Sequence, residues 1–307
     1  MTTLKQFRYL VALAQTRHFR RAAEQCQVTQ PTLSNQIQEL EKGLGVQLVE
    51  RDRRNRVVLT PVGEEIVTRV RVVLRDVQDI IAIGKHGQDW LQGTIRLGSP
   101  PTLGPYFLPH VLPALHRDYP SLKLYVREGM PSALIDSLAN AELDILLFPL
   151  PIEGSDFTSV RLFREQLWVV VPSDHRLAEQ EHIDPSELEG ETVLALERGH
   201  RLHDQVVEIC RDVNADLSHD FEGTSLDMLR LMVGMGLGIS FMPTVYVLSE
   251  TPKDPQVVAR RMQKKPPMRT IGLAWRRHSS RSPEYTSLAN AMREVLRTNA
   301  PDVTVIK

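Results

Sequence analysis

Apolar residues recur at helical spacing within the first sixty positions of the chain. The clearest stripe comprises Leu33, Ile37, Leu40 and Leu44, which are four, three and four residues apart. This spacing predicts an amphipathic helix that buries these four side chains. A shorter helical pattern precedes it, and a polar break at residues 26–29 separates the two. The two patterns together predict a helix-turn-helix.

The second of these helices opens with small, neutral, hydrogen-bonding side chains. Thr29 is expected to cap it, and Pro31 falls in the first turn, where its missing N–H costs no hydrogen bond. Amides, hydroxyls and free N–H groups at such an end can read base edges in the major groove of double-stranded DNA and bind phosphate oxygens. The expected DNA contacts are Arg20, Thr29, Gln30, Pro31, Thr32, Ser34 and Asn35.

A cluster of arginines follows the predicted recognition helix. Arg51, Arg53, Arg54 and Arg56 lie within six residues, directly before a β-prone run at residues 57–59. On the tip of a hairpin, Arg51, Arg53 and Arg54 are expected to neutralise DNA phosphates, which fixes register without reading sequence. The alternative is a packed helical hairpin with a merely solvated basic loop.

A longer helical pattern begins at Pro61. Its apolar positions are spaced alternately four and three residues apart, which is the heptad pattern of a coiled coil. We expect this linker helix to pair two chains, so that a dimer reads a pseudo-palindromic site; the alternative is an ordinary amphipathic helix. The heptad positions are Ile66, Val70, Val73, Val77, Ile80 and Gly84.

Beyond residue 93, short β-prone runs alternate with helical patterns. β-prone runs lie at residues 94–98, 122–126 and 143–148, and helical patterns at 108–117 and 133–140. This alternation predicts parallel sheets of the α/β class. A second series begins at residue 167, with helices at 203–212 and 226–234, and a late strand (270–275) and helix (284–297) close the chain. Two lobes with a ligand cleft between them are expected.

These patterns predict three domains. A DNA-binding domain covers residues 1–60, a dimerisation helix 61–88, and an effector domain 89–307. Within the effector domain, we expect lobe I to comprise residues 89–164 and 268–307, and lobe II residues 165–267. Residues 87–93 are predicted to form the hinge between the linker helix and the effector domain.

Composition adds a charge asymmetry. The 307 residues carry a net charge of −1, but the first sixty hold ten basic and five acidic side chains and therefore carry +5, leaving −6 for the rest. A basic head on an acidic body favours nucleic-acid binding by the head. With only two cysteines, Cys26 and Cys210, a disulfide framework is excluded, and we expect the protein to reside in a reducing cytoplasm. No apolar run reaches the length of a membrane span.

Enzyme chemistry has little support in the sequence. His200 and His203 lack a third zinc ligand at convincing spacing, and Ser225 lacks a nucleophile-elbow context. The glycines at 234, 236 and 238 follow a helix and precede a strand, which predicts a structural turn. Asp144 is interpreted as a strand-start residue. We therefore expect no enzyme, cofactor or metal; the alternative is a small-molecule-binding module or enzyme with an incidental DNA-binding head.

The N-terminal motifs resemble those of LysR-type transcriptional regulators. The resemblance implies a winged helix-turn-helix, a linker helix, and an α/β effector domain with two lobes like periplasmic binding proteins. It also implies a homodimer, or a homotetramer, that contacts RNA polymerase and binds a small-molecule effector. The matching residues are Ala22, Ala23, residues 30–34 (QPTLS), Leu40-Glu41, Leu44-Gly45, Arg51 and Leu59-Thr60-Pro61.

Further segments resemble OxyR, the hydrogen-peroxide-sensing branch of this family. They lie at residues 104–106, 108–110, 199–200, 204–205, 224–226 and 269–273. The resemblance implies a peroxide pocket comprising Thr102, His200, Asp204, Ser225 and Arg269. It also implies a reactive cysteine at position 201 and a resolving cysteine at 210. Position 210 is Cys210, but position 201 is Arg201.

This departure affects the expected peroxide-sensing chemistry, whereas the expectation of a DNA-binding regulator does not depend on it. A guanidinium cannot attack peroxide as a thiolate does, so two-cysteine peroxide sensing of oxidative-stress-type genes is predicted to be lost. Cys210 alone is interpreted as a partly buried, inert thiol. Arg201 at a helix start should have an anionic partner, either Asp204, Glu197 or a bound ligand. The open readings are a surface ion pair, a small anion or carboxylate held by Arg201 and Arg269, or a constitutively locked regulator.

Overall fold

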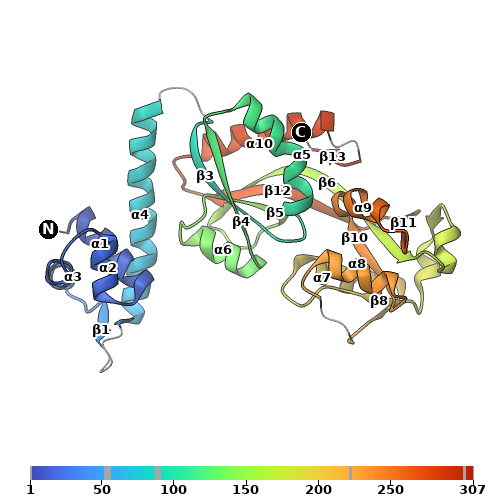
Figure 1. The fold of residues 1–307 in the computed structure, drawn as a ribbon, viewed down its shortest axis with the longest axis horizontal. Coiled ribbons are helices and arrows are strands. Elements are labelled where there is room, and N and C mark those ends of the chain that lie inside the picture. Colours follow the sequence, from blue (N-terminus) through green and yellow to red (C-terminus); the bar gives the residue numbers. More distant parts are fainter. Residues whose placement is uncertain (1, 52–56, 87–90, 221–222, 300–301, 307) are drawn as a thin grey trace. The chain divides into compact units, whose positions relative to one another are not determined.

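The computed structural model describes residues 2–51, 57–86, 91–220, 223–299 and 302–306 (Figure 1). The chain divides into two compact units. The N-terminal unit comprises residues 1–87 together with 140–142, and the C-terminal unit comprises residues 88–139 and 143–307. Among the described residues, the helices are all too short or too polar to cross a membrane. The predicted hinge at 87–93 lies mostly outside the described residues.

The N-terminal unit packs three helices, a hairpin and a long helix. Its core is formed by α1, α2 and α3, with Leu10, Leu13, Leu33, Ile37 and Leu40 fully buried. The elements are α1 (Leu4–Thr16), α2 (Phe19–Gln25), α3 (Gln30–Leu44), β1 (Val49–Arg51), β2 (Val57–Leu59) and α4 (Pro61–His86). Strands β1 and β2 pair antiparallel, as the predicted wing requires.

Most of the stripe predicted for α3 is buried, but Leu44 is not. Leu44 is 38% exposed. It is the last helical residue, and Gly45 takes a left-handed φ of 69° that turns the chain away. The stripe therefore ends one turn earlier than its spacing predicted.

Helix α4 uses only part of its apolar surface within one chain. The heptad prediction was wrong for Val70, which is buried with Val67 in the core of its own N-terminal unit. The predicted heptad positions Val73 and Ile80 are 40% and 65% exposed. Apolar heptad positions that stay exposed in a single chain are what a pairing surface requires.

The C-terminal unit contains a mixed sheet with strand order β4-β3-β5-β12-β6-β10-β8-β9. Strands β3 (Gly93–Ser99), β4 (Leu122–Glu128) and β5 (Ile145–Leu150) are parallel, and so are β8 (Thr192–Leu194), β9 (Asp216–Leu217) and β10 (Ile239–Pro243). The expectation of parallel sheets was wrong for β6 (Phe157–Pro172) and β12 (Met268–Arg276). These two strands pair antiparallel with their neighbours.

Strand β6 runs without interruption through the predicted boundary between the lobes at residues 164 and 165. Its first half pairs with β12 and β13 (Thr304–Val305), and its second half pairs with β10 and β11 (Val257–Met262). One strand therefore belongs to both halves of the unit. Its mixed polarity hid this role, because only residues 167–171 form a continuous apolar run.

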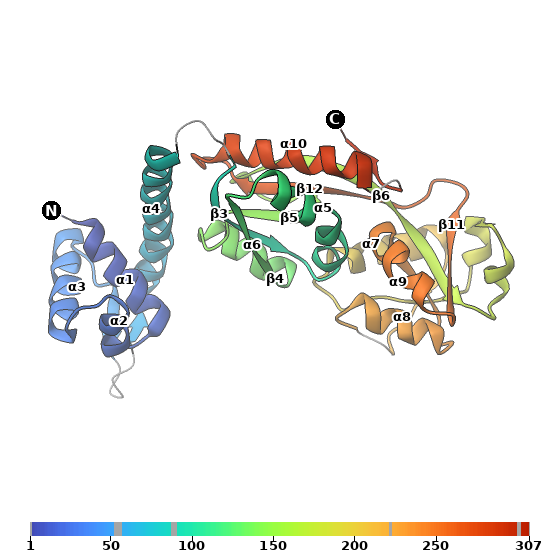
Figure 2. The same cartoon turned by 45° about the horizontal axis from the view of Figure 1, so that its top comes forward.

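Helices cover this sheet on both faces. Figure 2 shows α10 lying along strands β6 and β12, which it contacts. The helices are α5 (Gly104–Asp118), α6 (Pro131–Ala139), α7 (Arg201–Val213), α8 (Leu226–Gly234), α9 (Thr244–Glu250) and α10 (Ser282–Asn299). The remaining short elements are η1 (Arg176–Glu179), β7 (His182–Ile183), η2 (Pro185–Leu188) and η3 (Thr251–Lys253).

The glycines between α8 and β10 form a turn. Gly236 has a φ of 78° and Gly238 a φ of 155°. A Cβ on Gly238 would lie 2.6 Å from the Thr192 carbonyl oxygen, so glycine is needed there for close approach of two strands. This agrees with the predicted structural turn.

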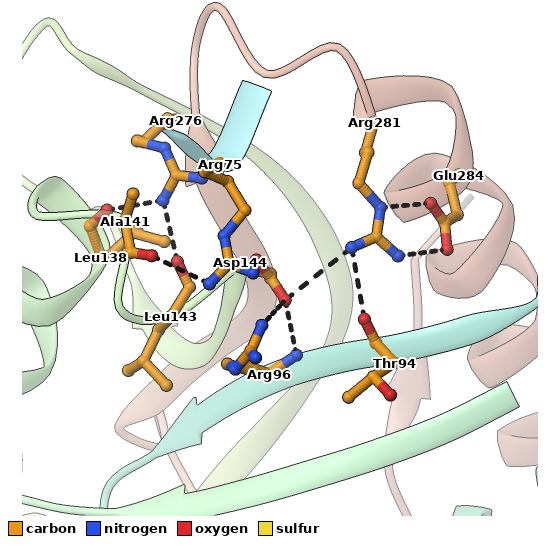
Figure 3. Close-up of polar contacts among 10 residues, drawn as sticks. All are labelled: Arg75, Thr94, Arg96, Leu138, Ala141, Leu143, Asp144, Arg276, Arg281 and Glu284. Carbon is orange, nitrogen blue, oxygen red and sulfur yellow. Dashed lines mark hydrogen bonds and ion pairs between the residues drawn. The ribbon is translucent and has the colours of Figure 1, made fainter. Parts of the chain in front are cut away.

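Asp144 is a structural residue at the start of β5 (Figure 3). It is fully buried, and its Oδ2 accepts a hydrogen bond of 2.7 Å from the Arg96 backbone N–H. The guanidinium of Arg281 lies 3.8 Å from the same oxygen and holds Glu284 with bonds of 2.6 and 2.7 Å. Asp144 thus links the start of β5 to β3 and to Arg281 at the start of α10, as a strand-start residue can.

Candidate DNA-binding helix and effector site

The N-terminal end of α3 is built to present polar groups to solvent. The Thr29 side chain caps the helix, since its Oγ1 accepts the Thr32 N–H at 3.4 Å and lies 2.8 Å from the Thr32 hydroxyl. Of the contacts predicted at this end of the helix, Ser34 is half-buried and the others are exposed: Thr29, Gln30, Pro31, Thr32 and Asn35. The cap and the buried stripe therefore hold these groups on one accessible end.

Glu41 connects this helix to the wing, a role that the sequence pattern does not indicate. Its Oε1 accepts the backbone N–H groups of Leu48 at 2.7 Å and Val49 at 3.1 Å. Thr60 closes the other side of the hairpin by donating to the Gln47 carbonyl at 2.7 Å. Because a carboxylate bound to two N–H groups fixes the strand, the wing is held in a set position against α3.

The arginines predicted to bind phosphate differ in how far the structure describes them. Arg20 is exposed on α2 and pairs with Glu24 at 3.1 Å. Arg51 ends β1, opposite Val57. Arg53 and Arg54 lie outside the described residues, as does Arg56.

In the C-terminal unit, Arg269 is buried in an ion pair. It is 3% exposed, and its Nε donates to Glu165 Oε1 at 2.7 Å. The other oxygen of Glu165 accepts the Val245 N–H at 2.9 Å, and Arg269 Nη2 donates to the Thr102 carbonyl at 3.4 Å. The pair thus joins β6, β12, α9 and the loop before α5. Glu165 was missed because its stretch of alternating charges looks like surface.

His200 is buried directly before α7. It is 1% exposed, and neither ring nitrogen has a hydrogen-bond partner within the described structure. Burial lowers the pKa of this imidazole, and the Glu197 carboxylate, at 3.9 Å, opposes that effect. A lowered pKa favours the neutral ring at pH 7.

Arg201 contacts the segment that follows β5. Its Nη2 donates to the Pro151 carbonyl at 2.7 Å, and its Nη1 lies 3.4 Å from Glu153 Oε1. The expected partners Asp204 and Glu197 were therefore wrong. Glu153 lies 48 residues earlier in the sequence, so no local spacing could identify it.

Two other residues predicted for the effector pocket have separate places. Asp204 is exposed and lines a polar recess of about 570 Å³. Its neighbours there include Arg198, His203 and Glu208. The Ser225 hydroxyl caps α8 by accepting the Met228 N–H at 3.2 Å. The structure brings Thr102 and Arg269 together, whereas Asp204 lines this other recess and Ser225 serves as a cap.

Both thiols are poorly disposed to ionise. Cys210 is 4% exposed, and burial raises its pKa to about 11. Cys26, in the N-terminal unit, is half-buried, and burial raises its pKa as well. The described residues contain no group of three or more His, Cys, Asp or Glu side chains that could hold a metal ion.

Comparisons with known proteins give one consistent result. Residues 4–64 match the bacterial regulatory helix-turn-helix protein, lysR family, and residues 88–298 match the LysR substrate binding domain. The chain is 40% identical over 290 residues to the DNA-binding transcriptional dual regulator OxyR of Escherichia coli (strain K12), covering 94% of each chain. It is 34% identical over 296 residues to a hydrogen peroxide-inducible genes activator of Haemophilus influenzae, covering 96% of this chain and 97% of that one.

Solved structures agree with these relatives. Full-length OxyR from Pseudomonas aeruginosa, with a cysteine-to-aspartate substitution, superposes with a TM-score of 0.79 at 37% identity, covering 95% of this chain and 98% of that one. Corynebacterium glutamicum OxyR with a cysteine-to-serine substitution and bound hydrogen peroxide gives a TM-score of 0.67 at 31% identity, covering 98% and 96%. The predicted resemblance to LysR-type regulators and to the OxyR branch is confirmed.

Proposed function

Since the chain belongs to the LysR family of DNA-binding transcription regulators and is OxyR-like, we propose that the N-terminal end of α3 reads its operator. The exposed, capped group formed by Gln30, Thr32 and Asn35 supports this role, because amide and hydroxyl side chains suit base edges in the major groove. Arg20, Arg51, Arg53 and Arg54 would bind flanking phosphates. The protein acts as a regulator in the cytoplasm, where its DNA lies, and not as an enzyme.

The proposed assembly is a homodimer that pairs through α4 and associates further into a homotetramer. Exposed apolar heptad positions on α4 support the pairing. Two recognition helices then bind two half-sites, and a change of geometry in the C-terminal units alters their spacing and the contact with RNA polymerase. The domain limits proposed for this arrangement are 1–60, 61–88 and 89–307.

We further propose that two-cysteine peroxide sensing is lost in this protein. The observation that carries this is the state of positions 201 and 210: Arg201 binds Pro151 and Glu153, and Cys210 is a buried thiol with a raised pKa. The thiolate is the species that attacks peroxide, so neither position supplies a peroxide-reactive group. Arg201 instead locks the start of α7 to the segment after β5.

A second candidate is a regulator that responds to a small anion in place of peroxide. The two arginines expected to hold such an anion already have acceptors: Arg269 is paired with Glu165, and Arg201 with Glu153. This candidate therefore requires other cationic side chains in the C-terminal unit.

Footprinting on the protein's own promoter region, with and without peroxide, tests the proposal. We expect a sequence-specific, salt-sensitive footprint that peroxide leaves unchanged. Arg201→Cys should make the footprint respond to peroxide, and Arg201→Gln, which removes the ion pair without adding sulfur, is the matched control. A wild-type response as strong as that of Arg201→Cys would contradict the loss of cysteine sensing. The absence of any specific footprint would contradict the proposed reading by α3.

A further inference from the structure

A basic recess lies where β5, β12 and β6 meet in the C-terminal unit. Its volume is about 340 Å³, and it is lined by Leu150, Pro151, Ser159, Arg161, Arg164 and Thr270. In the strand register, Thr270 lies between Leu150 of β5 and Arg164 of β6. Every lining residue except Pro151, which directly follows β5, is a strand residue, and strands are more rigid than loops.

The charge of this lining is unbalanced. It includes two arginines and no carboxylate. Both Arg161 and Arg164 are exposed, and within the described structure neither guanidinium has a hydrogen bond or an ion pair. The polar recess beside α7 differs, since its lining includes two acids, Asp204 and Glu208, as well as two arginines. Guanidinium groups without partners in a concave site are available as bidentate hydrogen-bond donors to a carboxylate or phosphate.

The rest of the lining suits a small organic body. The hydroxyls of Ser159 and Thr270 have no partner within the described residues, and Leu150 and Pro151 supply an apolar side. Ligand sites commonly combine apolar walls with a few convergent polar groups. We infer that this recess binds a small organic oxyanion, a carboxylate or a phosphate monoester, whose anionic group is held by Arg161 and Arg164.

One contact connects this recess to α7. The Pro151 carbonyl, at the edge of the recess, accepts the 2.7 Å hydrogen bond from Arg201, the first residue of α7. A ligand that shifts Pro151 would therefore alter the hydrogen bond between Arg201 and the Pro151 carbonyl. This regulatory meaning rests on the proposed function, whereas the binding itself does not.

Isothermal titration of the full chain with succinate and with inorganic phosphate tests the site. We expect at least one probe to bind with a Kd of about 1 mM or tighter. Arg161→Gln and Arg164→Gln should each weaken binding, and the double variant should weaken it at least about tenfold. Arg117→Gln is the matched control, because Arg117 is exposed on α5, outside the recess, and pairs with Asp118.

The outcomes separate the two sources of the anion. Binding of succinate alone assigns a carboxylate ligand, and binding of phosphate alone assigns a phosphorylated one. The inference is overturned if neither probe binds, or if the double variant binds as tightly as wild type. Thermal unfolding of the unliganded variants shows whether they fold. Footprinting is an independent measurement, so failure of DNA binding with intact anion binding would count against the proposed function alone.

Discussion

Glu165 is a buried acid whose two oxygens bind two different elements. One oxygen pairs with Arg269 at 2.7 Å and the other accepts the Val245 N–H at 2.9 Å. We expect Arg269→Leu to destabilise the C-terminal unit by about 3–5 kcal/mol, because it leaves a buried carboxylate without its counter-charge. Urea denaturation followed by fluorescence measures this loss.

The exposed pair between Arg297 and Glu294 provides the control for that measurement. Both side chains are largely solvent-accessible, so Arg297→Gln should change the free energy of unfolding by no more than about 0.5 kcal/mol. An equally small effect of Arg269→Leu would show that the Glu165 pair contributes little to stability.

Cys210 gives a prediction about pH. Burial raises the pKa of its thiol to about 11, so only about one thiol in 10,000 is ionised at pH 7. The folded pKa lies above that of the unfolded chain. The thiol's contribution to stability is therefore complete below pH 9 and is lost as the pH rises toward about 11.

Alkylation with iodoacetamide, followed by mass spectrometry across this pH range, tests the prediction. Modification of Cys210 should be slow at pH 8 in the folded chain and should accelerate only near the raised pKa. The urea-unfolded chain is the reference. Equal rates for the folded and unfolded chains at pH 8 would contradict a buried, protonated thiol.

At the scale of elements, α4 offers a test of chain pairing. Ile80 is an apolar heptad position that is 65% exposed in a single chain. A charge placed in a paired seam is strongly unfavourable, so Ile80→Asp should shift the chain toward monomer and weaken operator binding. Gln78→Asp adds the same charge on the outer face of the helix. It should leave the molar mass of the assembly in solution as in wild type. Light scattering coupled to size-exclusion chromatography measures the oligomeric state of both variants. An Ile80→Asp variant that remains a dimer would contradict pairing through these heptad positions.

Elements defined by local signals could be predicted from the sequence. Thr29, Pro31 and Gly45 mark the limits of α3 because caps and turns act over a few residues. Strand β6 could not be predicted in full. Its first half carries Arg161, Arg164 and Glu165, and it becomes a strand by pairing with β12, about a hundred residues later. The partners of the site residues were unpredictable for the same reason: Glu165 and Glu153 lie far in sequence from Arg269 and Arg201.

At the scale of the whole molecule, charge is distributed unevenly between the head and the remainder of the chain. The first sixty residues carry +5 and the rest carry −6. The head can therefore bind DNA while the remaining residues limit non-specific adhesion to it. The net charge of −1 for the whole chain does not reveal this separation of basic and acidic segments.

Arg53 and Arg54, which are proposed to bind phosphates, give a prediction about the salt dependence of DNA binding. Each phosphate contact contributes about 0.9 to the slope of log K against log salt on duplex DNA. Replacing Arg53 and Arg54 together with glutamine should therefore reduce that slope by about 2, while weakening operator and random DNA alike. Arg117→Gln, in the C-terminal unit, should leave the slope unchanged.

A base-reading side chain should behave differently from the wing. Gln30→Ala removes an exposed amide at the start of α3, so it should weaken operator binding by about 1–3 kcal/mol and leave the salt slope and random-DNA binding unchanged. Fluorescence anisotropy titrations of both DNAs over a range of salt concentrations separate the two effects. The assignment of phosphate contacts to Arg53 and Arg54 would be contradicted if their double variant lost only operator binding. The assignment of base contacts to α3 would be contradicted if Gln30→Ala weakened operator and random-DNA binding equally.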